Sequence, residues 1–312
     1  MGGPVTMGSG AAFVFPGQGS QRVGMLDSLP SAALPESLLD LAEDVTGLPV
    51  RAIATEGPAS ALADTRVAQP LLFVSGLAWA RVADSSGVRP RAVAGHSLGE
   101  LTALVYAGVM EPDDGMRLVC ERARLMAEAT TTVPGTMAAV LGMSSDEIAA
   151  VIDSLDGIWV GNENGPGQVT ISGTHSGVER ATAALLGAGA RRVVPLAVAG
   201  AFHSPLMADA SAAFSALLGT VRFADARIPV AQNTGPSLAT SAPLIRERLA
   251  TQMVRPVGWT AIMESLRSEG IVVLAECGPG AVLTGMARRM EGLEGVSLGT
   301  DGTERLREVV LG

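Results

Sequence analysis

The sequence predicts an α/β fold in which a small domain is inserted into a large one. The chain has 312 residues, which is long for one domain. Short apolar runs that end at glycine alternate with helical segments, a pattern typical of a parallel sheet covered by helices. Between residues 133 and 198 the order becomes strand, helix, strand, strand, helix, strand, which is the split βαβ arrangement. We therefore expect a ferredoxin-like domain over 133–198 and a large α/β domain formed by 1–132 and 199–312.

The large domain begins with the apolar run 11–15, which ends in a turn rich in glycine and is expected to be a buried strand. Proline is favoured in the first turn of a helix, so Pro70 is expected to open the next helix. The elements expected in this domain are strands at 11–15, 92–94, 228–231 and 271–276 and helices at 70–83, 97–109, 114–129, 243–253 and 260–269.

The helix expected at 114–129 carries one charge on its apolar side. Glu121, Arg124 and Glu128 repeat at helical spacing and form a polar face with Arg117. Arg122 instead falls among leucine, valine and methionine on the opposite face. A buried charge is unfavourable unless it is paired, so Arg122 is expected to meet an anionic partner.

The small domain has its own start and stop signals. Ser144 followed by Glu147 forms a capping box that starts a helix reaching about residue 155. Asn162 and Asn164 lie in a segment rich in glycine and asparagine, which is expected to be a loop. The elements expected here are strands at 136–141, 158–160, 168–171 and 192–195, helices at 144–155 and 176–187, and a loop at 162–167.

Composition excludes several classes of protein. Hydrophobic residues make up 47% of the chain and charged residues 17%, which excludes an extensively disordered protein. The net charge of −9 argues against a nucleic-acid-binding surface. Two cysteines are too few for a disulfide scaffold or a thiolate zinc site, and we expect no metal site. Without an export signal or an apolar spanning segment, a cytoplasmic location away from the membrane is expected.

Gly95-His96-Ser97-Leu98-Gly99 matches the nucleophile-elbow pattern G-x-S-x-G. Its position between a predicted strand and a predicted helix is the context that the pattern requires, and it makes the large domain α/β-hydrolase-like. The elbow exposes the Ser97 hydroxyl, and the Leu98 N–H at the start of the helix is placed to stabilise an oxyanion. Ser97 is therefore the candidate nucleophile.

A serine nucleophile needs a base, and the chain has three histidines. His96 adjoins Ser97, but adjacent side chains of an elbow diverge. His175 lies in a turn of the small domain and is expected at the surface. His203 lies where the chain leaves the small domain, and clefts form at such junctions, so it is the preferred base.

The turn around Gln18 is either an ordinary turn or the source of a second oxyanion N–H.

Five ordered motifs resemble one enzyme family. They are Phe15-Pro16-Gly17-Gln18-Gly19-Ser20-Gln21, Gly95-His96-Ser97-Leu98-Gly99-Glu100, the helix of Arg122, Gly200-Ala201-Phe202-His203-Ser204, and Glu276-Cys277-Gly278-Pro279-Gly280. Together they resemble the malonyl-CoA:acyl carrier protein transacylase family, which includes the acyltransferases of polyketide synthases. The resemblance runs from about residue 12 to about residue 290.

The resemblance implies roles residue by residue. Ser97 is similar to the family's nucleophile and His203 to its base, which the backbone carbonyl of Gln252 orients. Gln18 and Leu98 match the amides of the oxyanion hole. Arg122 matches the arginine that binds the free carboxylate of a malonyl group, and an arginine–carboxylate pair is bidentate and strong.

The substrate pocket is implied in the same way. Phe202 and His96 are placed among the substrate-binding residues, and Phe202 with Leu98 resembles the malonyl-selective members. Asn162 and Asn164 match a loop that lines the cleft. Gly200 departs from polyketide-type domains, which often have a second histidine at this position.

The implied reaction is ping-pong transfer of malonyl from malonyl-CoA through an acyl-serine to the phosphopantetheine thiol of an acyl carrier protein. No metal or bound cofactor is implied. The partners are the acyl-CoA and a separate acidic carrier protein, and the pairs Arg191-Arg192 and Arg288-Arg289 are candidate docking residues or ordinary solvated pairs.

Three other functions are compatible with parts of the pattern. The protein could transfer another acyl group between carrier proteins, load the carrier subunit of a malonate decarboxylase, or hydrolyse stalled thioesters. Arg122 argues against the hydrolase, which has no need to bind a carboxylate, and retention of Ser97, His203 and Arg122 argues against a non-catalytic scaffold. The sequence leaves open the pathway (fatty-acid or polyketide), the acyl donor, the carrier and the oligomeric state.

Overall fold

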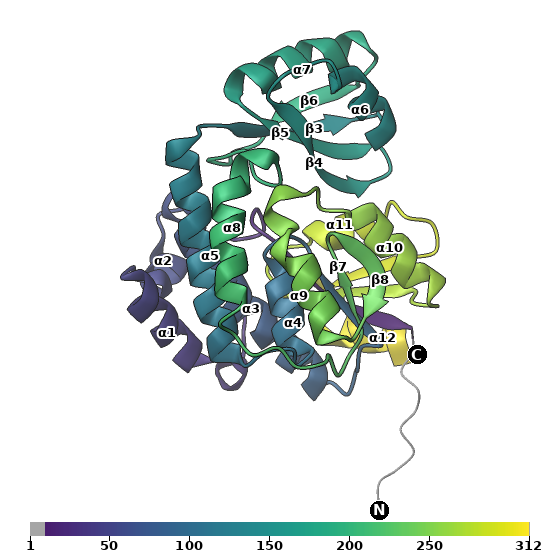
Figure 1. Ribbon diagram of the computed structural model, residues 1–312. Coiled ribbons are helices and arrows are strands. Elements are labelled where there is room, and N and C mark those ends of the chain that lie inside the picture. Colours follow the sequence, from purple (N-terminus) through teal and green to yellow (C-terminus); the bar gives the residue numbers. More distant parts are fainter. Residues whose placement is uncertain (1–9, 312) are drawn as a thin grey trace, which may run out of the picture.

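The computed structural model describes residues 10–311 and contains two separate sheets (Figure 1). The larger sheet has the strand order β10-β9-β1-β2-β7-β8. Neighbouring strands run parallel except β7 and β8, which are antiparallel. Its strands are β1 (Ala11–Phe15), β2 (Ala92–Gly95), β7 (Val230–Gln232), β8 (Gly235–Ala239), β9 (Val273–Glu276) and β10 (Glu294–Ser297).

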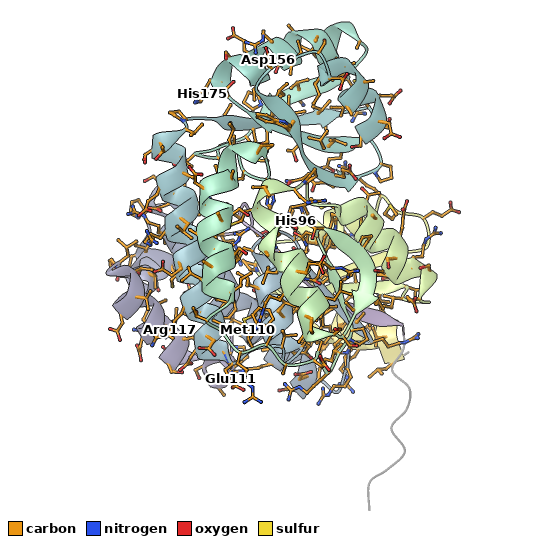
Figure 2. The ribbon with its side chains drawn as sticks, in the orientation of Figure 1. His96, Met110, Glu111, Arg117, Asp156 and His175 are labelled. Carbon is orange, nitrogen blue, oxygen red and sulfur yellow. The ribbon has the colours of Figure 1, made fainter. Side chains whose placement is uncertain are left out.

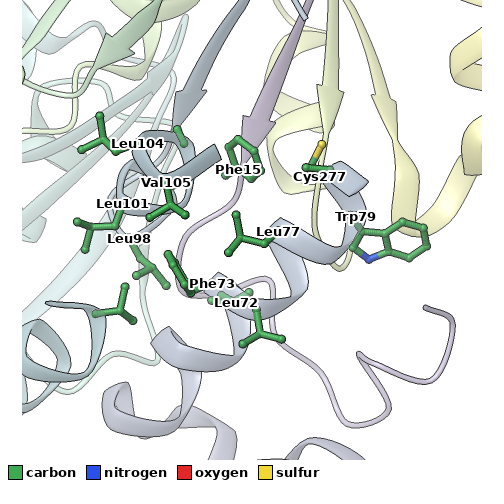
Figure 3. Packing of buried hydrophobic residues seen from close by; sticks show 14 of the residues in the cluster. Phe15, Leu72, Phe73, Leu77, Trp79, Leu98, Leu101, Leu104, Val105 and Cys277 are labelled. Atoms are coloured by element: carbon green, nitrogen blue, oxygen red, sulfur yellow. The ribbon is translucent and has the colours of Figure 1, made fainter. Parts of the chain in front are cut away.

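Helices cover both faces of this sheet because side chains alternate along its buried strands. In β1, Phe13 and Phe15 point into the larger core, whereas Val14 points into a second core on the opposite face. Figure 3 shows the larger core, where Phe15 lies near residues of α3 and α4. The helices around the large sheet are α1 (Glu36–Thr46), α2 (Val50–Glu56), α3 (Thr65–Ser85), α4 (Gly99–Tyr106), α5 (Pro112–Thr132), α8 (Ala208–Leu218), α9 (Ala242–Ala250), α10 (Trp259–Ser268), α11 (Val282–Ala287) and α12 (Leu298–Leu311).

The smaller sheet is antiparallel, with the strand order β4-β5-β3-β6. Its core forms between the sheet and two helices, and Figure 1 shows this unit at one end of the molecule. The order and topology are those of a ferredoxin-like unit, so the predicted fold class is confirmed. Its elements are β3 (Thr136–Leu141), α6 (Ser145–Ile152), β4 (Ile158–Gly165), β5 (Gln168–Gly173), α7 (His175–Gly187) and β6 (Arg192–Pro195).

Two local predictions were wrong. Helix α3 begins at Thr65 and has Pro70 in its interior, because the Asp64 side chain accepts a hydrogen bond from the Arg66 N–H and caps the helix five residues earlier. The segment 162–167 is a loop only at 166–167, since β4 continues to Gly165 by pairing with β5. The capping box at Ser144 is confirmed.

Residues 10–311 contain neither a membrane-spanning helix nor a cluster of metal-binding side chains. No helix there is both long and apolar enough to span a bilayer, and no group of three His, Cys, Asp or Glu residues is arranged to hold a metal ion.

Candidate active site

The loop between β2 and α4 forms a strained elbow around Ser97. Ser97 has φ of 51°, a left-handed conformation that a non-glycine residue adopts at a cost of about 1–3 kcal/mol. Gly99 is packed so tightly that a Cβ would lie 2.0 Å from the Phe15 carbonyl oxygen, and a Cβ on Gly95 would lie 1.9 Å from the Gly99 carbonyl carbon. The two glycines therefore let the chain turn sharply and expose Ser97 where the strand ends.

His203 meets Ser97 from a segment more than a hundred residues away. Its Nε2 lies 2.8 Å from Ser97 Oγ, and its Nδ1 lies 3.0 Å from the Gln252 carbonyl oxygen. Because a carbonyl only accepts, Nδ1 carries the proton and Nε2 is left to accept the serine proton. His203 also has a left-handed backbone, with φ of 57°.

Burial and a nearby positive charge keep His203 neutral. The side chain is buried, and desolvation followed by the Arg122 charge lowers the pKa of His203 to about 3. A neutral imidazole with its lone pair on Ser97 is the protonation state that a general base requires.

Arg122, on α5, is fully buried and ends beside the serine. Its Nη2 donates to Ser97 Oγ at 3.1 Å and to Gln252 Oε1 at 2.9 Å. Desolvation lowers the pKa of Arg122 to about 10, so the guanidinium remains charged at neutral pH. The expected anionic partner is not in salt-bridge contact within residues 10–311, and neutral groups hold Arg122 instead.

Two glutamines orient these groups, and the sequence analysis missed the contribution of their side chains. Gln69 Oε1 accepts from Arg122 Nη1 at 2.9 Å, and Gln69 Nε2 contacts the sulfur of Met126. Gln252 Nε2 donates to the Ser97 carbonyl at 2.9 Å. Gln69 lies on α3 inside an apolar stretch, and a buried amide in such a stretch was the signal that could have identified it.

The two expected oxyanion amides border the same space as the serine. No hydrogen bond within residues 10–311 uses the backbone N–H of Gln18 or Leu98. Both residues line a cavity of about 90 Å³. The other lining residues are Gln69, His96, Ser97, Met126, Met137, Asn162, Leu196, Val198, Phe202 and His203.

His96 lines the same cavity as the base and is hydrogen-bonded to the small sheet. Its Nε2 is 2.8 Å from Asn164 Oδ1, and its ring centroid is 5.6 Å from that of Trp259. Desolvation lowers the pKa of His96. Figure 2 shows His96 between the two sheets, with His175 near the outer end of the small one. His175 is exposed and outside the site.

The small sheet contributes to the cavity through β3 and β4. Asn162 and Met137 line it, and the side-chain oxygen of Asn162 is buried with no hydrogen-bond partner in the described part of the chain. Gly200 is constrained by its neighbours, because a Cβ there would lie 2.4 Å from Thr130 Cγ2 and 3.1 Å from the Phe202 ring. A histidine at position 200 would therefore require this segment to move.

In this site a serine hydroxyl is hydrogen-bonded to a neutral imidazole, an arrangement that has the chemistry needed for acyl transfer. The family model described as "Acyl transferase domain" matches residues 12–296, so the chain belongs to the acyl transferase domain family and is an acyltransferase.

Three named relatives are similar to this chain over nearly their whole length. The malonyl CoA-acyl carrier protein transacylase of Escherichia coli K12 is 40% identical over 284 residues, which cover 89% of this chain and 92% of the relative. The Vibrio cholerae acyl carrier protein S-malonyltransferase structure is 38% identical with a TM-score of 0.86, covering 93% of this chain and 96% of that one. A malonyl-transacylase in complex with a type II polyketide synthase acyl-carrier protein is 37% identical with a TM-score of 0.89, covering 96% and 100%.

Proposed function

We propose that the protein transfers a malonyl group from malonyl-CoA to the phosphopantetheine thiol of an acyl carrier protein, in fatty-acid or polyketide synthesis. The observation that carries this proposal is the buried Arg122 guanidinium beside Ser97 Oγ. It is charged, its hydrogen-bond acceptors within residues 10–311 are all neutral, and its Nε–H has no partner among those residues. A carboxylate entering the cavity would fill these donors with strong, charge-assisted hydrogen bonds.

The reaction begins when His203 Nε2 takes the Ser97 proton and Ser97 Oγ attacks the thioester carbonyl. The tetrahedral oxyanion is stabilised by the N–H groups of Leu98 and Gln18. Coenzyme A leaves as its sulfur receives the proton from His203, and a malonyl ester remains on Ser97. The carrier's thiol then gives its proton to His203 and attacks this ester, and the collapsing intermediate returns the proton to Ser97. Side chains and backbone of this chain perform each step.

The substrate's carboxylate also adjusts the base. The Arg122 charge is one of the groups that lower the pKa of His203. A malonyl carboxylate paired with Arg122 offsets that charge and makes His203 a stronger base when the correct acyl group is bound. Phe202 lines the same small cavity and crowds a branch at C2 of the acyl group, which favours unbranched malonyl.

Carrier docking is assigned to the basic residues near the small sheet. Gln168, Leu141 and Arg192 form one cross-strand row, so their side chains share a face of that sheet. Arg289 donates to Gln168 Oε1 at 2.7 Å, which brings the 288–289 pair to the same face. Arg191 and the other three arginines are exposed and form no salt bridge within residues 10–311. An acidic carrier fits this patch on a protein whose net charge is −9.

The decisive experiment follows the acyl group by mass. The protein is incubated with malonyl-, methylmalonyl-, acetyl- and butyryl-CoA, the adduct is measured on the intact chain, and carrier protein is added. A malonyl adduct that Ser97→Ala abolishes and that discharges onto the carrier is the expected result. Free acid without transfer indicates a hydrolase, and the absence of any adduct indicates a carrier-bound donor. Either result contradicts the proposal.

Docking is tested separately with charge reversal. Arg192→Glu and Arg289→Glu are expected to raise the KM for the carrier about tenfold while acylation by malonyl-CoA changes little. Arg117→Glu, an exposed residue on α5, is the matched control. Equal effects of all three substitutions would contradict this placement.

We propose a cytoplasmic location, where coenzyme A thioesters and carrier proteins meet, to be checked by fractionation.

A further inference from the structure

The side chain of Asn233 bridges the two residues on either side of His96 in the strained elbow. Asn233 lies in the turn between β7 and β8, next to β2 in the large sheet. Its Nδ2 donates to the Gly95 carbonyl at 2.6 Å, and its Oδ1 accepts from the Ser97 N–H at 2.7 Å. Both ends of the amide are therefore used, one on each side of His96, and the orientation of the amide is determined by its partners.

Asn233 is itself held by a buried carboxylate. Glu100, on α4, accepts from the Asn233 N–H at 2.7 Å and from Gln232 Nε2 at 3.1 Å. The side chains of Glu100 and Gln232 are fully buried, and Asn233 is 3% exposed. These groups are out of contact with bulk solvent, so a hydrogen bond lost within the network leaves a buried polar group that is costly to leave unpaired.

We propose that Asn233 is a positioning residue that holds Ser97 in its reactive conformation, with Glu100 as its anchor. The left-handed backbone of Ser97 is disfavoured for a serine, so contacts outside the elbow must hold it. Asn233 supplies two of them, at the residue that ends β2 and at Ser97 itself. By occupying the Ser97 N–H, it also leaves the neighbouring Leu98 N–H as the elbow's oxyanion donor.

Loss of this clamp affects chemistry more than binding. Besides its bond to Ser97 Oγ, the Arg122 side chain is held by Gln69 and Gln252, and within residues 10–311 the Asn233 side chain forms no hydrogen bond to either glutamine. The binding of a malonyl group therefore survives when the elbow relaxes. The distance from Ser97 Oγ to His203 changes instead, and a displacement of about 1 Å in a reacting group can reduce the rate about 100-fold.

The test measures kcat and KM separately. Only this steady-state measurement rests on the proposed function. Asn233→Ala is expected to lower the kcat of malonyl transfer between about 10- and 100-fold, with KM for malonyl-CoA within about twofold of the parent. Asn233→Asp has nearly the same size and keeps the acceptor for the Ser97 N–H, but it places an oxygen in place of the N–H that donates to the Gly95 carbonyl, so kcat is expected to fall here as well. Each variant is first shown to be folded by its thermal transition.

A second readout is independent of the acyl donor. A fluorophosphonate probe reacts with an activated serine, and its labelling rate at Ser97 is expected to fall in both Asn233 variants, with Ser97→Ala as the blank. Thr234→Ala is the matched control, because Thr234 lies in the same turn but bonds to the Arg248 carbonyl on α9. It is expected to keep the parent kcat and labelling rate.

The outcomes distinguish the two proposals. A parent that forms no malonyl adduct contradicts the proposed function, and its labelling rate still tests Asn233. The positioning role is overturned if Asn233→Ala is folded and is labelled at the parent's rate. It is also overturned if Thr234→Ala loses as much kcat and labelling rate as Asn233→Ala does. If Asn233→Ala does not fold, Asn233→Asp decides by the same two measurements.

Discussion

The two sheets contribute differently to the cavity. The elements around the large sheet supply Ser97, His203, Arg122 and the two glutamines, and these side chains are hydrogen-bonded to one another. The small sheet supplies lining residues from β3 and β4, and within residues 10–311 its one side-chain hydrogen bond to the elbow is the one that Asn164 Oδ1 accepts from His96 Nε2. Reactive groups are thus connected through the larger core, whereas the small sheet shapes the space in front of them.

The small sheet is nevertheless fixed at one edge. The Glu163 N–H donates to the Val257 carbonyl and the Val257 N–H donates to the Gly161 carbonyl, both at 2.9 Å. Thr260 Oγ1 adds a bond of 3.0 Å to the Glu163 carbonyl. We therefore expect substitutions near the large sheet to lower the rate of acyl transfer strongly and substitutions in β4 to lower it little.

Arg122→Ala should produce the largest effect in this comparison. Charge-assisted hydrogen bonds to a carboxylate contribute about 1.5–3 kcal/mol, so malonyl transfer should fall about 10- to 100-fold further than acetyl transfer. The ratio of the two kcat/KM values is the measurement, and Arg117→Ala on the exposed face of the same helix is the control. Equal losses for both acyl groups would contradict the role of Arg122.

Gly278→Ala tests whether the packing of Gly278 against Pro16 keeps the loop of Gln18 in the position that the reaction needs. A Cβ on Gly278 would lie 2.4 Å from Pro16 Cγ, so the substitution should displace the loop that carries Gln18. We expect kcat to fall about tenfold with little change in KM, because losing an oxyanion donor affects the transition state. Gly285→Ala, which meets no atom within 4 Å, should leave kcat unchanged. A changed KM with the parent kcat would count against this explanation.

Asn164→Ala tests the small sheet. It removes one hydrogen bond to a neutral His96, which contributes about 1 kcal/mol, so kcat/KM should fall about fivefold. Asn162→Ala on the same strand removes an oxygen that has no partner in residues 10–311 and should have a smaller effect. A loss in Asn164→Ala as large as that in Arg122→Ala, measured in the same steady-state assay, would remove the distinction between the two sheets.

The smallest effect on kcat/KM is expected from a change in pH. The lowered pKa of His203 keeps the base neutral, so kcat/KM for acetyl transfer should show no inflection near pH 6.5. Between pH 6.5 and about 3 the unfolded chain binds the proton that folded His203 does not, so this residue's contribution to stability is lost as pH falls. Denaturant unfolding at pH 7 and pH 5 should show a smaller pH dependence in His203→Gln than in the parent. An equal dependence would contradict a buried neutral imidazole.

Local patterns predicted much of the fold. The strands at 11–15, 136–141 and 192–195 have the predicted bounds, because each is a short run between clear turn or cap signals. Strands β8 and β10 were not predicted, nor were helices α1, α2, α8, α11 and α12. The polar end of β4 was predicted as a loop, since it is a strand only through backbone pairing with β5 and Val257, which side-chain patterns do not record.

The sequence by itself determined which residue types could react. A serine in an elbow, one histidine at a junction and an arginine on an apolar helix face are local features, and periodicity and turn chemistry reveal them. Only the tertiary structure decided how they are oriented. The hydrogen bonds that Gln69, Gln252 and Asn233 accept join segments that lie 53, 49 and 136 residues apart. Their donors are Arg122, His203 and Ser97, in that order. Such contacts depend on how the elements pack around the large sheet, and no local pattern encodes them.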